Sequence, residues 1–337
     1  MSDDTIVYIL NDTSYEKHAG CLGVMDQIHK IVDAMSPPNT RVKTFSIKQI
    51  RQAKKEIIRQ HPTHIIINGE GTFHSDSKNG IRWMRFASEV RIKYQTKIAL
   101  INASWFRNKS LNSLLDICDL IYMRDQQSVK NASSVNSNLK IGLATDLFYF
   151  FCINNDPHFE KGGKLQYCND SVNFGVRERL RDFGKRFGIF GTSMFIADGP
   201  IENLSIIMNT FSKRRLGSIN YIKSFILSEL YFQKSKSMSE FMLRACSSSS
   251  IHTGRYHMVV LCLATGRPFL YYDTNTPKIE SLLHDVGLSG RKARPTIHPE
   301  IPKFSEMEKQ LLIKFNDQSH IQKEKLEKEI QAFLERT

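Results

Sequence analysis

The feature that most constrains the fold of this chain is a repeated alternation of short apolar segments with longer amphipathic ones. In the first half, the apolar segments predict strands at residues 5–10, 40–45, 64–68, 97–102, 120–123 and 139–143. The segments between them predict helices at residues 21–35, 47–60, 81–94, 111–118 and 127–132. Strands that alternate with helices in this way form parallel sheets with helices on both faces.

A second alternating series follows residues 154–170, a polar segment with glycine and proline that we interpret as a linker. Its predicted strands are residues 172–176, 192–197, 248–253 and 269–272. Its predicted helices are residues 201–212, 224–235, 238–245, 258–264 and 279–286, with a basic helix or loop at 177–187. Residues 309–336 predict a long charged helix with Glu–Lys pairs at i,i+4 spacing.

The expected fold class is therefore α/β, with two Rossmann-like domains facing a cleft and a charged C-terminal helix. The expected boundaries are residues 1–153 for the first domain, 154–170 for the linker, 171–303 for the second domain and 304–337 for the helix. Open α/β sheets bind ligands at the carboxyl ends of their strands, so the site should lie there.

Charge narrows the class of ligand. Lysine and arginine outnumber acidic residues 47 to 34, which gives a net charge of +13 over 337 residues. Such a balance fits an anionic small molecule, an anionic membrane surface or nucleic acid. Because no RNP motif, zinc finger or basic heptad array accompanies the charge, we expect no nucleic-acid partner, and we keep peripheral membrane contact as an option.

The six cysteines are scattered, without the spacing of a zinc site. We expect buried, reduced thiols, no metal and a cytoplasmic protein, possibly held at the inner face of the plasma membrane. The acidic N-terminus does not read as a secretory signal. The longest apolar run that we find, residues 258–264, is far shorter than the roughly 20 residues that cross a bilayer.

Residues 251–270 hold the strongest candidate site, with the sequence I-H-T-G-R-Y-H followed by an apolar run. We expect residues 258–264 to form a buried helix that Thr265 and Gly266 cap. Arg255 and His257 then lie at its N-terminus, where backbone N–H groups favour an anion such as a phosphate or carboxylate. We interpret the nearby His252 as structural.

Four pieces of the chain, in this order, resemble the polysaccharide pyruvyl transferase family. They are the glycine-rich turn I-I-I-N-G-E-G-T at residues 65–72, the R-D-x-x-S element at 124–128, A-T-D-L-F at 144–148, and G-R-Y-H at 254–257. The last piece continues into A-T-G-R-P-F and D-T-N-T-P-K-I, which ends at Ile279. Together they cover residues 11–288, nearly the whole chain.

The resemblance implies a fold like that of the B-type (GT-B) glycosyltransferases, with the acceptor on the first domain and the donor on the second. It also implies that phosphoenolpyruvate, a substrate rather than a cofactor, reacts with two hydroxyls of a sugar. The products are a pyruvate ketal and phosphate, and the acceptor is a cell-surface polysaccharide, such as a capsule or exopolysaccharide, or its lipid-linked precursor. No cofactor and no metal are expected.

The resemblance also assigns roles to residues. Arg124, Arg255 and His257 contact the donor, and we add Lys278 to them. From the chemistry of the residues we expect His257 to be the catalytic acid. Glu70 and Asp146 are the carboxylates at strand ends, and we take Glu70 as the base. The expected acceptor or cleft residues are Asn68, Gly69, Gly71, Thr72 and Asp146.

Other interpretations stay open at this point. Arg124 could belong to an internal ion pair, the glycines could serve an ordinary turn, and Lys278 could be solvated. His18, His74 and Asp12 are polar loop residues that we leave without a role. The chain departs from the family's N-x-G-D opening, which leaves the acceptor undefined. The alternative functions are a GT-B glycosyltransferase that uses a nucleotide-activated sugar, and a non-catalytic subunit of a membrane-bound complex.

Overall fold

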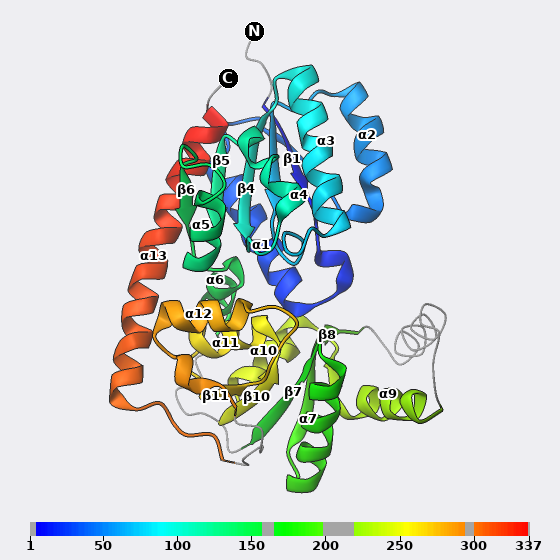
Figure 1. Cartoon of the computed structure of the whole chain (residues 1–337), viewed down its shortest axis with the longest axis vertical. Helices are drawn as coiled ribbons and strands as arrows, with labels where there is room; N and C mark the ends of the chain where they lie inside the picture. The colour runs from blue at the N-terminus through cyan, green and yellow to red at the C-terminus, as the bar shows by residue number, and fades with distance from the viewer. Residues whose placement is uncertain (1–4, 157–164, 198–218, 294–299, 336–337) are drawn as a thin grey trace. The chain divides into compact units, whose positions relative to one another are not determined.

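A computed structural model describes residues 5–156, 165–197, 219–293 and 300–335 of the chain (Figure 1). It divides into two compact units. The N-terminal unit comprises Met1–Tyr15, Val24–Leu147 and Phe315–Thr337, and the C-terminal unit comprises Glu16–Gly23 and Phe148–Lys314. Each unit is an α/β fold built on one parallel sheet, as the sequence predicts.

The N-terminal unit is built on a six-stranded sheet in which every strand pair is parallel. Its strands, in sheet order, are β2 (Arg41–Phe45), β1 (Ile6–Leu10), β3 (His64–Asn68), β4 (Lys97–Ala103), β5 (Leu120–Met123) and β6 (Ile141–Leu143). Its helical elements are η1 (Ser14–Glu16), α1 (Ala19–Met35), η2 (Ile47–Gln49), α2 (Ile50–Arg59), α3 (Lys78–Tyr94), α4 (Lys109–Asn112), η3 (Leu115–Ile117) and α5 (Gln126–Ser133). The predicted helix at 111–118 is thus broken into α4 and η3.

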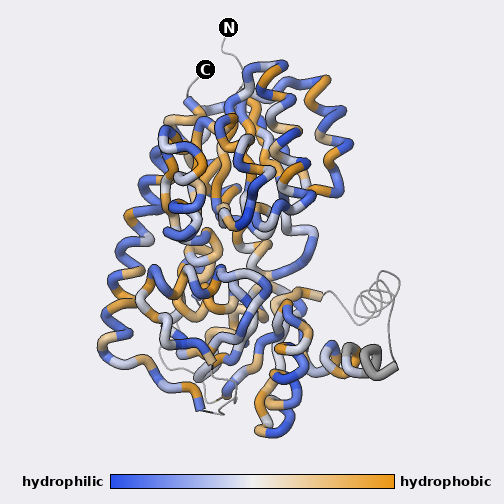
Figure 2. Tube along the Cα trace, viewed as in Figure 1, coloured by the Kyte–Doolittle hydropathy of each residue, from blue (hydrophilic) through white to orange (hydrophobic). Residues whose placement is uncertain are grey.

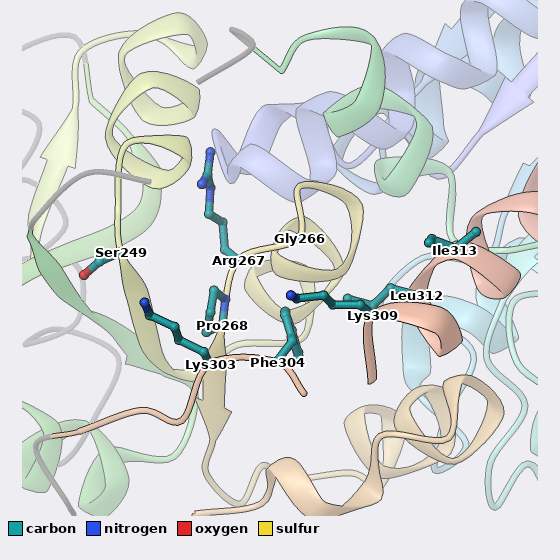
Figure 3. A pocket seen from close by; sticks show the side chains of 9 residues that line it. All are labelled: Ser249, Gly266, Arg267, Pro268, Lys303, Phe304, Lys309, Leu312 and Ile313. Carbon is teal, nitrogen blue, oxygen red and sulfur yellow. The ribbon is translucent and has the colours of Figure 1, made fainter. Parts of the chain in front are cut away.

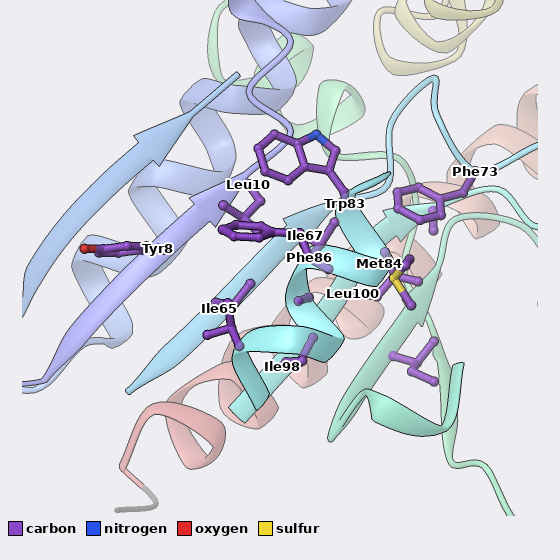
Figure 4. Close-up of a cluster of buried hydrophobic side chains, with 14 of the residues drawn as sticks. Tyr8, Leu10, Ile65, Ile67, Phe73, Trp83, Met84, Phe86, Ile98 and Leu100 are labelled. Carbon is purple, nitrogen blue, oxygen red and sulfur yellow. The ribbon is translucent and has the colours of Figure 1, made fainter. Parts of the chain in front are cut away.

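Alternation along the strands assigns helices to the two faces of this sheet. Tyr8, Ile65 and Ile98 share one face and pack in a buried cluster with side chains of α2 and α3 (Figure 4). On the opposite face His64 contacts Phe333 of α13 (Glu306–Glu335) at 4.9 Å between ring centroids. The central strands β1, β3 and β4 are mostly hydrophobic along their length (Figure 2) and are buried on both faces, as expected of a covered parallel sheet.

The C-terminal unit is built on a five-stranded parallel sheet. Its strands, in sheet order, are β11 (Phe269–Tyr271), β10 (Ser250–Gly254), β7 (Gln166–Ser171), β8 (Phe190–Ile196) and β9 (Gln233–Ser235). Its helical elements are α6 (Leu147–Asn154), α7 (Phe174–Phe187), α9 (Ile219–Tyr231), α10 (Met238–Cys246), α11 (Tyr256–Ala264), α12 (Lys278–Val286) and η4 (Ser289–Arg291). Glycines in the left-handed region follow α11 and α12, at Gly266 (φ 62°) and Gly287 (φ 82°), and the cap at Gly266 is as predicted.

The strand order places a topological switch point in each sheet. In the N-terminal unit the chain runs outward from β1 to β2 and then continues on the other side of β1 with β3. In the C-terminal unit it runs outward from β7 through β8 to β9 and then crosses to β10 beside β7. Ligands of open α/β sheets bind beyond the carboxyl ends of the strands at such points.

The sequence-based assignment is wrong around residues 154–176. The expected linker contains the central strand β7, and the expected strand at 172–176 is instead the start of α7. The error arises because β7 has the polar sequence Q-Y-C-N-D-S, in which the buried Asn169 and Asp170 are satisfied by hydrogen bonds to neighbouring residues. The helix expected at 224–235 ends at Tyr231, before β9, and the one expected at 201–212 lies outside the described residues.

The units also differ in composition from the expected domains. Residues 315–337, expected to lie outside both domains, count with the N-terminal unit, and residues 16–23 count with the C-terminal unit. The C-terminal helix itself is present as α13. All six cysteines are unpaired, and five of them are buried, as expected.

Candidate active site

The switch point of the C-terminal unit holds a buried ion pair between Asp170 and Arg255. Asp170 is the penultimate residue of β7, and Arg255 is the N-cap residue that joins β10 to α11. Arg255 Nε donates to Asp170 Oδ1 at 2.9 Å, and Nη2 donates to Oδ2 at 2.8 Å. This bidentate pair fixes the plane and direction of the guanidinium.

Short polar and small residues at the strand ends make this approach possible. Thr253 Oγ1 donates to Asn169 Oδ1 at 3.0 Å, which ties β10 to β7 just before the pair. The backbone N–H of Arg255 donates to the same Thr253 hydroxyl at 3.0 Å. A Cβ on Gly254 would lie 2.3 Å from Ser171 Oγ, so only glycine fits between the strands there.

His257 lies in the first turn of α11, against one aromatic side chain and one glycine. The ring of Phe148, the last residue of the A-T-D-L-F element, meets the imidazole edge-on at 5.4 Å between centroids. Gly20 packs directly on the other side, since a Cβ there would lie 2.2 Å from Cγ of His257. Two sequence elements that resemble family motifs therefore meet at this imidazole.

His18 is the second imidazole of the cluster, with its ring centroid 5.4 Å from that of His257. The backbone N–H of Gly20 donates to His18 Nδ1 at 3.2 Å, which places the proton of the neutral ring on Nε2. Burial lowers the pKa of His18 well below its usual value, and the charges of His257 and Arg255 lower it further. His18 is thus held as a neutral donor.

The pKa of Asp170 is set by burial and by three basic neighbours. Burial raises the pKa of this carboxyl group and is the largest single effect, but the surrounding basic groups together outweigh it, Arg255 first through its charge and its hydrogen bonds. Arg177 and His18 lower the pKa of Asp170 further, so the group is below its usual value. The carboxylate is therefore ionised at neutral pH and holds Arg255 in place.

The switch point of the N-terminal unit contains the glycine-rich turn and a network of buried polar groups. Asn11, in the left-handed region (φ 65°), donates from Nδ2 to the carbonyl of Asn68 at 2.7 Å and to Thr72 Oγ1 at 2.5 Å. Thr13 Oγ1 donates to Glu70 Oε2 at 2.7 Å. A carboxylate between two glycines is predicted to be exposed, and for Glu70 this prediction is wrong, because the residue is 3% exposed. Its carboxylate turns inward because the Thr13 hydroxyl offers it a hydrogen bond.

Glycine is required at two positions of this turn, for a different reason at each. A Cβ on Gly69 would lie 2.5 Å from Cα of Ala103 on β4, so close packing of the backbones requires glycine. Gly71 has φ 68° and nothing within 4 Å, so its requirement is conformational. Both are turn requirements, and the predicted role of this loop in acceptor binding stays a prediction.

Arg124 and Asp146 form an ion pair inside the N-terminal unit. Arg124 Nη1 donates to Asp146 Oδ2 at 2.6 Å, and Nε donates to Ser104 Oγ at 2.6 Å. The side chains are 2% and 0% exposed. The structure thus brings two predicted site residues together at the carboxyl edge of the sheet, and their expected contacts with donor and acceptor stay predictions.

The remaining candidates have separate places. Lys278 is the first residue of α12 and is half-buried. His252 is fully buried and bonds through Nδ1 to the hydroxyl of Tyr272 at 2.9 Å, which agrees with its structural interpretation. His74 is half-buried beside the glycine-rich turn, and Asp12 Oδ1 accepts from the backbone N–H of Ser14 at 2.8 Å.

Comparison with known proteins supplies the family. The model of the polysaccharide pyruvyl transferase family matches residues 24–276, three quarters of the chain. The chain belongs to this family. No curated protein sequence matches this chain. Family membership makes the protein a transferase with a pyruvate donor and a polysaccharide acceptor.

Solved structures resemble this pyruvyl transferase family member only distantly. A protein of uncharacterised function from Klebsiella pneumoniae is 12% identical, with a TM-score of 0.46, covering 87% of this chain and 93% of its own. UDP-GlcNAc 2-epimerase from Methanocaldococcus jannaschii is 13% identical, with a TM-score of 0.47 and coverages of 84% and 88%. The E. coli ADP-heptose LPS heptosyltransferase II is 9% identical, with a TM-score of 0.37 and coverages of 93% and 98%.

The side chains around Arg255 and His257 form what we call the imidazole–guanidinium cluster. The sequence analysis gave no functional role to three of its members. Asp170 fell in the expected linker, His18 was left without a role, and Phe195 was only part of a predicted strand. The ring centroid of Phe195 lies 5.5 Å from Cζ of Arg255, which stands over the ring. The same ring meets the His18 ring edge-on, with 5.2 Å between the centroids. The polar end of β7, N-D-S, followed by a helix, was the available signal for Asp170.

A cavity of about 630 Å³ lies elsewhere in the C-terminal unit of this family member (Figure 3). Its walls include Ser249 and Pro268, which precede β10 and β11, so it opens at the amino edge of the sheet. The cluster around Arg255 lies at the carboxyl edge, where open α/β sheets bind ligands. We therefore place the chemistry at the cluster and not in this cavity.

Among residues 5–156, 165–197, 219–293 and 300–335, no three His, Cys, Asp or Glu side chains are grouped to hold a metal ion. Within the same residues, no helix is long and apolar enough to cross a membrane.

Proposed function

We propose that the protein transfers pyruvate from phosphoenolpyruvate, as a ketal, onto a sugar of a cell-surface polysaccharide or of its lipid-linked precursor. The observation that carries the proposal is the arrangement of Arg255, His257 and His18 at the switch point of the C-terminal unit. A fixed guanidinium and two imidazoles at a helix N-terminus match the phosphate and carboxylate of this donor.

Arg255 is suited to hold one anionic group of the donor. Its bonds to Asp170 use Nε and one hydrogen of Nη2, so the Nη1 side of the guanidinium faces away from the carboxylate. His18, fixed as the Nε2–H tautomer by Gly20, adds an uncharged donor. Both bind the donor's oxygens in this proposal.

His257 is the proposed acid. Protonation of the methylene carbon of phosphoenolpyruvate makes C2 electrophilic, and one sugar hydroxyl then bonds to C2. The bond from C2 to the phosphate oxygen breaks, phosphate leaves, and the second hydroxyl bonds to C2. Of the two hydroxyl protons, one replaces the proton given to the methylene carbon and the other leaves with phosphate. A histidine suits such transfers because its pKa lies near working pH.

The wider setting belongs to the same proposal. The donor is a substrate, and the reaction as written needs neither a dissociable cofactor nor a metal. Phosphoenolpyruvate is a metabolite of the cytoplasm, so we propose that the protein works there. Two further roles remain predictions from the sequence: Glu70 as the base, and Arg124 and Lys278 as additional ligands of the donor.

The proposal is tested by incubating the protein with phosphoenolpyruvate and candidate glycans, free and lipid-linked. We expect release of phosphate together with a glycan that carries the pyruvate ketal. His257→Gln should lower the rate by about 100-fold or more, the usual contribution of a general acid. Arg244→Ala is the control, because Arg244 pairs with Glu240 on α10 and lies outside the cluster.

Two outcomes would overturn the proposal. One is phosphate release that Arg255→Ala leaves unchanged, since the donor pocket would then be elsewhere. The other is calorimetric binding of a nucleoside diphosphate with no response to phosphoenolpyruvate. That result would favour a glycosyltransferase.

A further inference from the structure

The positive charge of the protein is concentrated on two neighbouring helices of the N-terminal unit. Helices α2 and α3 together carry nine basic residues and two acidic ones. Their excess of seven is more than half of the chain's net charge of +13. The two helices lie side by side on one face of the sheet (Figure 1), and Lys54 of α2 bridges to Glu89 of α3 at 3.5 Å.

Helical spacing directs these charges outward. On α2, Ala53 and Ile57 are buried against the core, so Arg51, Lys54 and Lys55 point away from it. On α3 the buried side includes Trp83, Ala87 and Val90. We call the exposed basic set the α2–α3 basic face: Arg51, Lys54, Lys55, Arg59, Lys78, Arg82, Arg85 and Lys93.

Little on this face neutralises the charge. Glu56 pairs with Lys43 on β2, and Glu89 pairs with Lys54. Arg91, which is half-buried and not counted in the basic face, pairs with Asp119. In the described structure Arg82 and Arg85 make no salt bridge with an acidic side chain, so the potential of the face is strongly positive.

Two aliphatic side chains project from the same face. Ile58 on α2 is 70% exposed and Ile92 on α3 is 83% exposed. Ile58 follows Arg51 by seven residues and Ile92 follows Arg85 by seven, so each shares a helix side with basic residues. Exposed aliphatic residues among cations are typical of surfaces that enter the headgroup region of a membrane.

We propose that the α2–α3 basic face docks the protein on an anionic phospholipid surface. The cations contact lipid phosphates, and Ile58 and Ile92 enter the boundary of the acyl chains. A single-stranded nucleic acid fits less well, because base stacking needs exposed aromatic rings. Trp83 and Phe86 are buried, and the half-buried Tyr94 stacks on His61 at 4.0 Å.

The C-terminal helix does not offer a comparable basic surface. Helix α13 carries five lysines and seven acidic residues, so it is not basic. Lys323 pairs with Glu327, and Lys325 lies 3.9 Å from Glu329. The inference concerns binding alone, so it is independent of the proposed donor and acceptor.

The test is co-sedimentation of the full chain with vesicles. One set contains phosphatidylcholine alone, and the other contains phosphatidylcholine and phosphatidylglycerol in equal amounts. We expect binding to the second set only, and weaker binding as salt is raised because exposed charges are screened. Arg82→Glu with Arg85→Glu should weaken binding about tenfold or more. Ile58→Ser with Ile92→Ser should weaken it while leaving the salt dependence.

The matched control is Lys314→Glu with Lys328→Glu on α13, which changes the net charge equally at exposed positions. It should bind as the wild type does. Equal losses in the control and in the arginine variant would overturn the proposal, because binding would then follow total charge. Binding to single-stranded RNA but not to the anionic vesicles would overturn it in favour of nucleic acid. Circular dichroism of each variant checks that the fold is retained.

Discussion

At the scale of single residues, one buried carboxylate determines how the guanidinium of the candidate site is presented. Asp170 is 1% exposed and lies 85 positions before Arg255 in the chain. Without it, Arg255 would keep its charge but lose the bidentate contact that fixes its direction. Orientation of binding groups is itself worth a large part of catalysis, and small displacements cost up to about 100-fold.

Asp170→Asn should therefore raise the KM for phosphoenolpyruvate about tenfold to 100-fold, with a smaller change in kcat. Steady-state phosphate release measures both. Asp119→Asn is the control, since Asp119 also holds an arginine, Arg91, but on the other unit and partly exposed. Unchanged kinetics of Asp170→Asn in an active enzyme would show that the pair does not position the donor ligand.

The lowered pKa of Asp170 sets the pH range of this effect. A carboxylate stabilised by folding contributes fully above its unfolded value of about 3.9 and loses the contribution as pH falls through the lower folded value. The difference in thermal stability between wild type and Asp170→Asn should thus be constant from pH 7 to about 5 and shrink below about 4. A difference that disappears between pH 6 and 7 would point to a histidine instead.

A further prediction for a single residue concerns Gly20, which packs against His257. An added methyl group would overlap the root of the His257 side chain, which cannot swing away without moving α11. We expect Gly20→Ala to cost about 1–3 kcal/mol of stability, as overpacking does, and most of the transferase activity. Gly175→Ala on α7 is the control, since its added Cβ meets nothing closer than 3.6 Å. Full activity of Gly20→Ala would mean that His257 tolerates displacement.

Among the helices and strands, α13 shows how a segment near the C-terminus packs against a sheet formed by the first half of the chain. Thr145, just after β6, bonds through its hydroxyl to Ser319 Oγ at 2.7 Å and through its backbone N–H to Gln322 at 3.0 Å. Leu326, Ile330 and Phe333 are buried on the same helix. The last third of α13 is thus part of the core of the N-terminal unit.

Ile330→Ala should destabilise the N-terminal unit by about 2–5 kcal/mol, the cost of a cavity at a fully buried aliphatic residue. Hydrogen exchange should show the loss of protection in β3 and β4. Ile321→Ala is the matched control on the same helix, because Ile321 is 66% exposed and its truncation should cost little. Equal effects of both variants would contradict this packing.

For the whole molecule, the reactivity of the cysteine thiols measures how well side chains in both units are buried. Cys21, Cys152, Cys168, Cys246 and Cys262 are buried, and Cys118 is half-buried. Burial raises the pKa of Cys168 and Cys246 to about 12, so their reactive thiolate form is scarce near pH 8.

A thiol reagent at pH 8 should therefore label the native protein slowly, including the half-buried Cys118, whose pKa burial also raises, and label all six thiols once the protein is unfolded. Mobility on a denaturing gel should be the same with and without reductant, because no cysteine is paired. Rapid labelling of more than one thiol in the native state would contradict the burial. The count of labelled thiols by mass spectrometry separates these outcomes.

Most helices and strands could be predicted from the sequence, because apolar periodicity, glycine caps and proline stops are local signals. The sequence also located Arg255 and His257 at the start of α11 and indicated the family. Only the tertiary structure decided that polar β7 is a central strand, that Asp170 holds Arg255, that His18 meets His257, and that α13 covers the N-terminal sheet. These contacts join residues far apart in the chain, and their partners follow from strand order, which no local pattern contains.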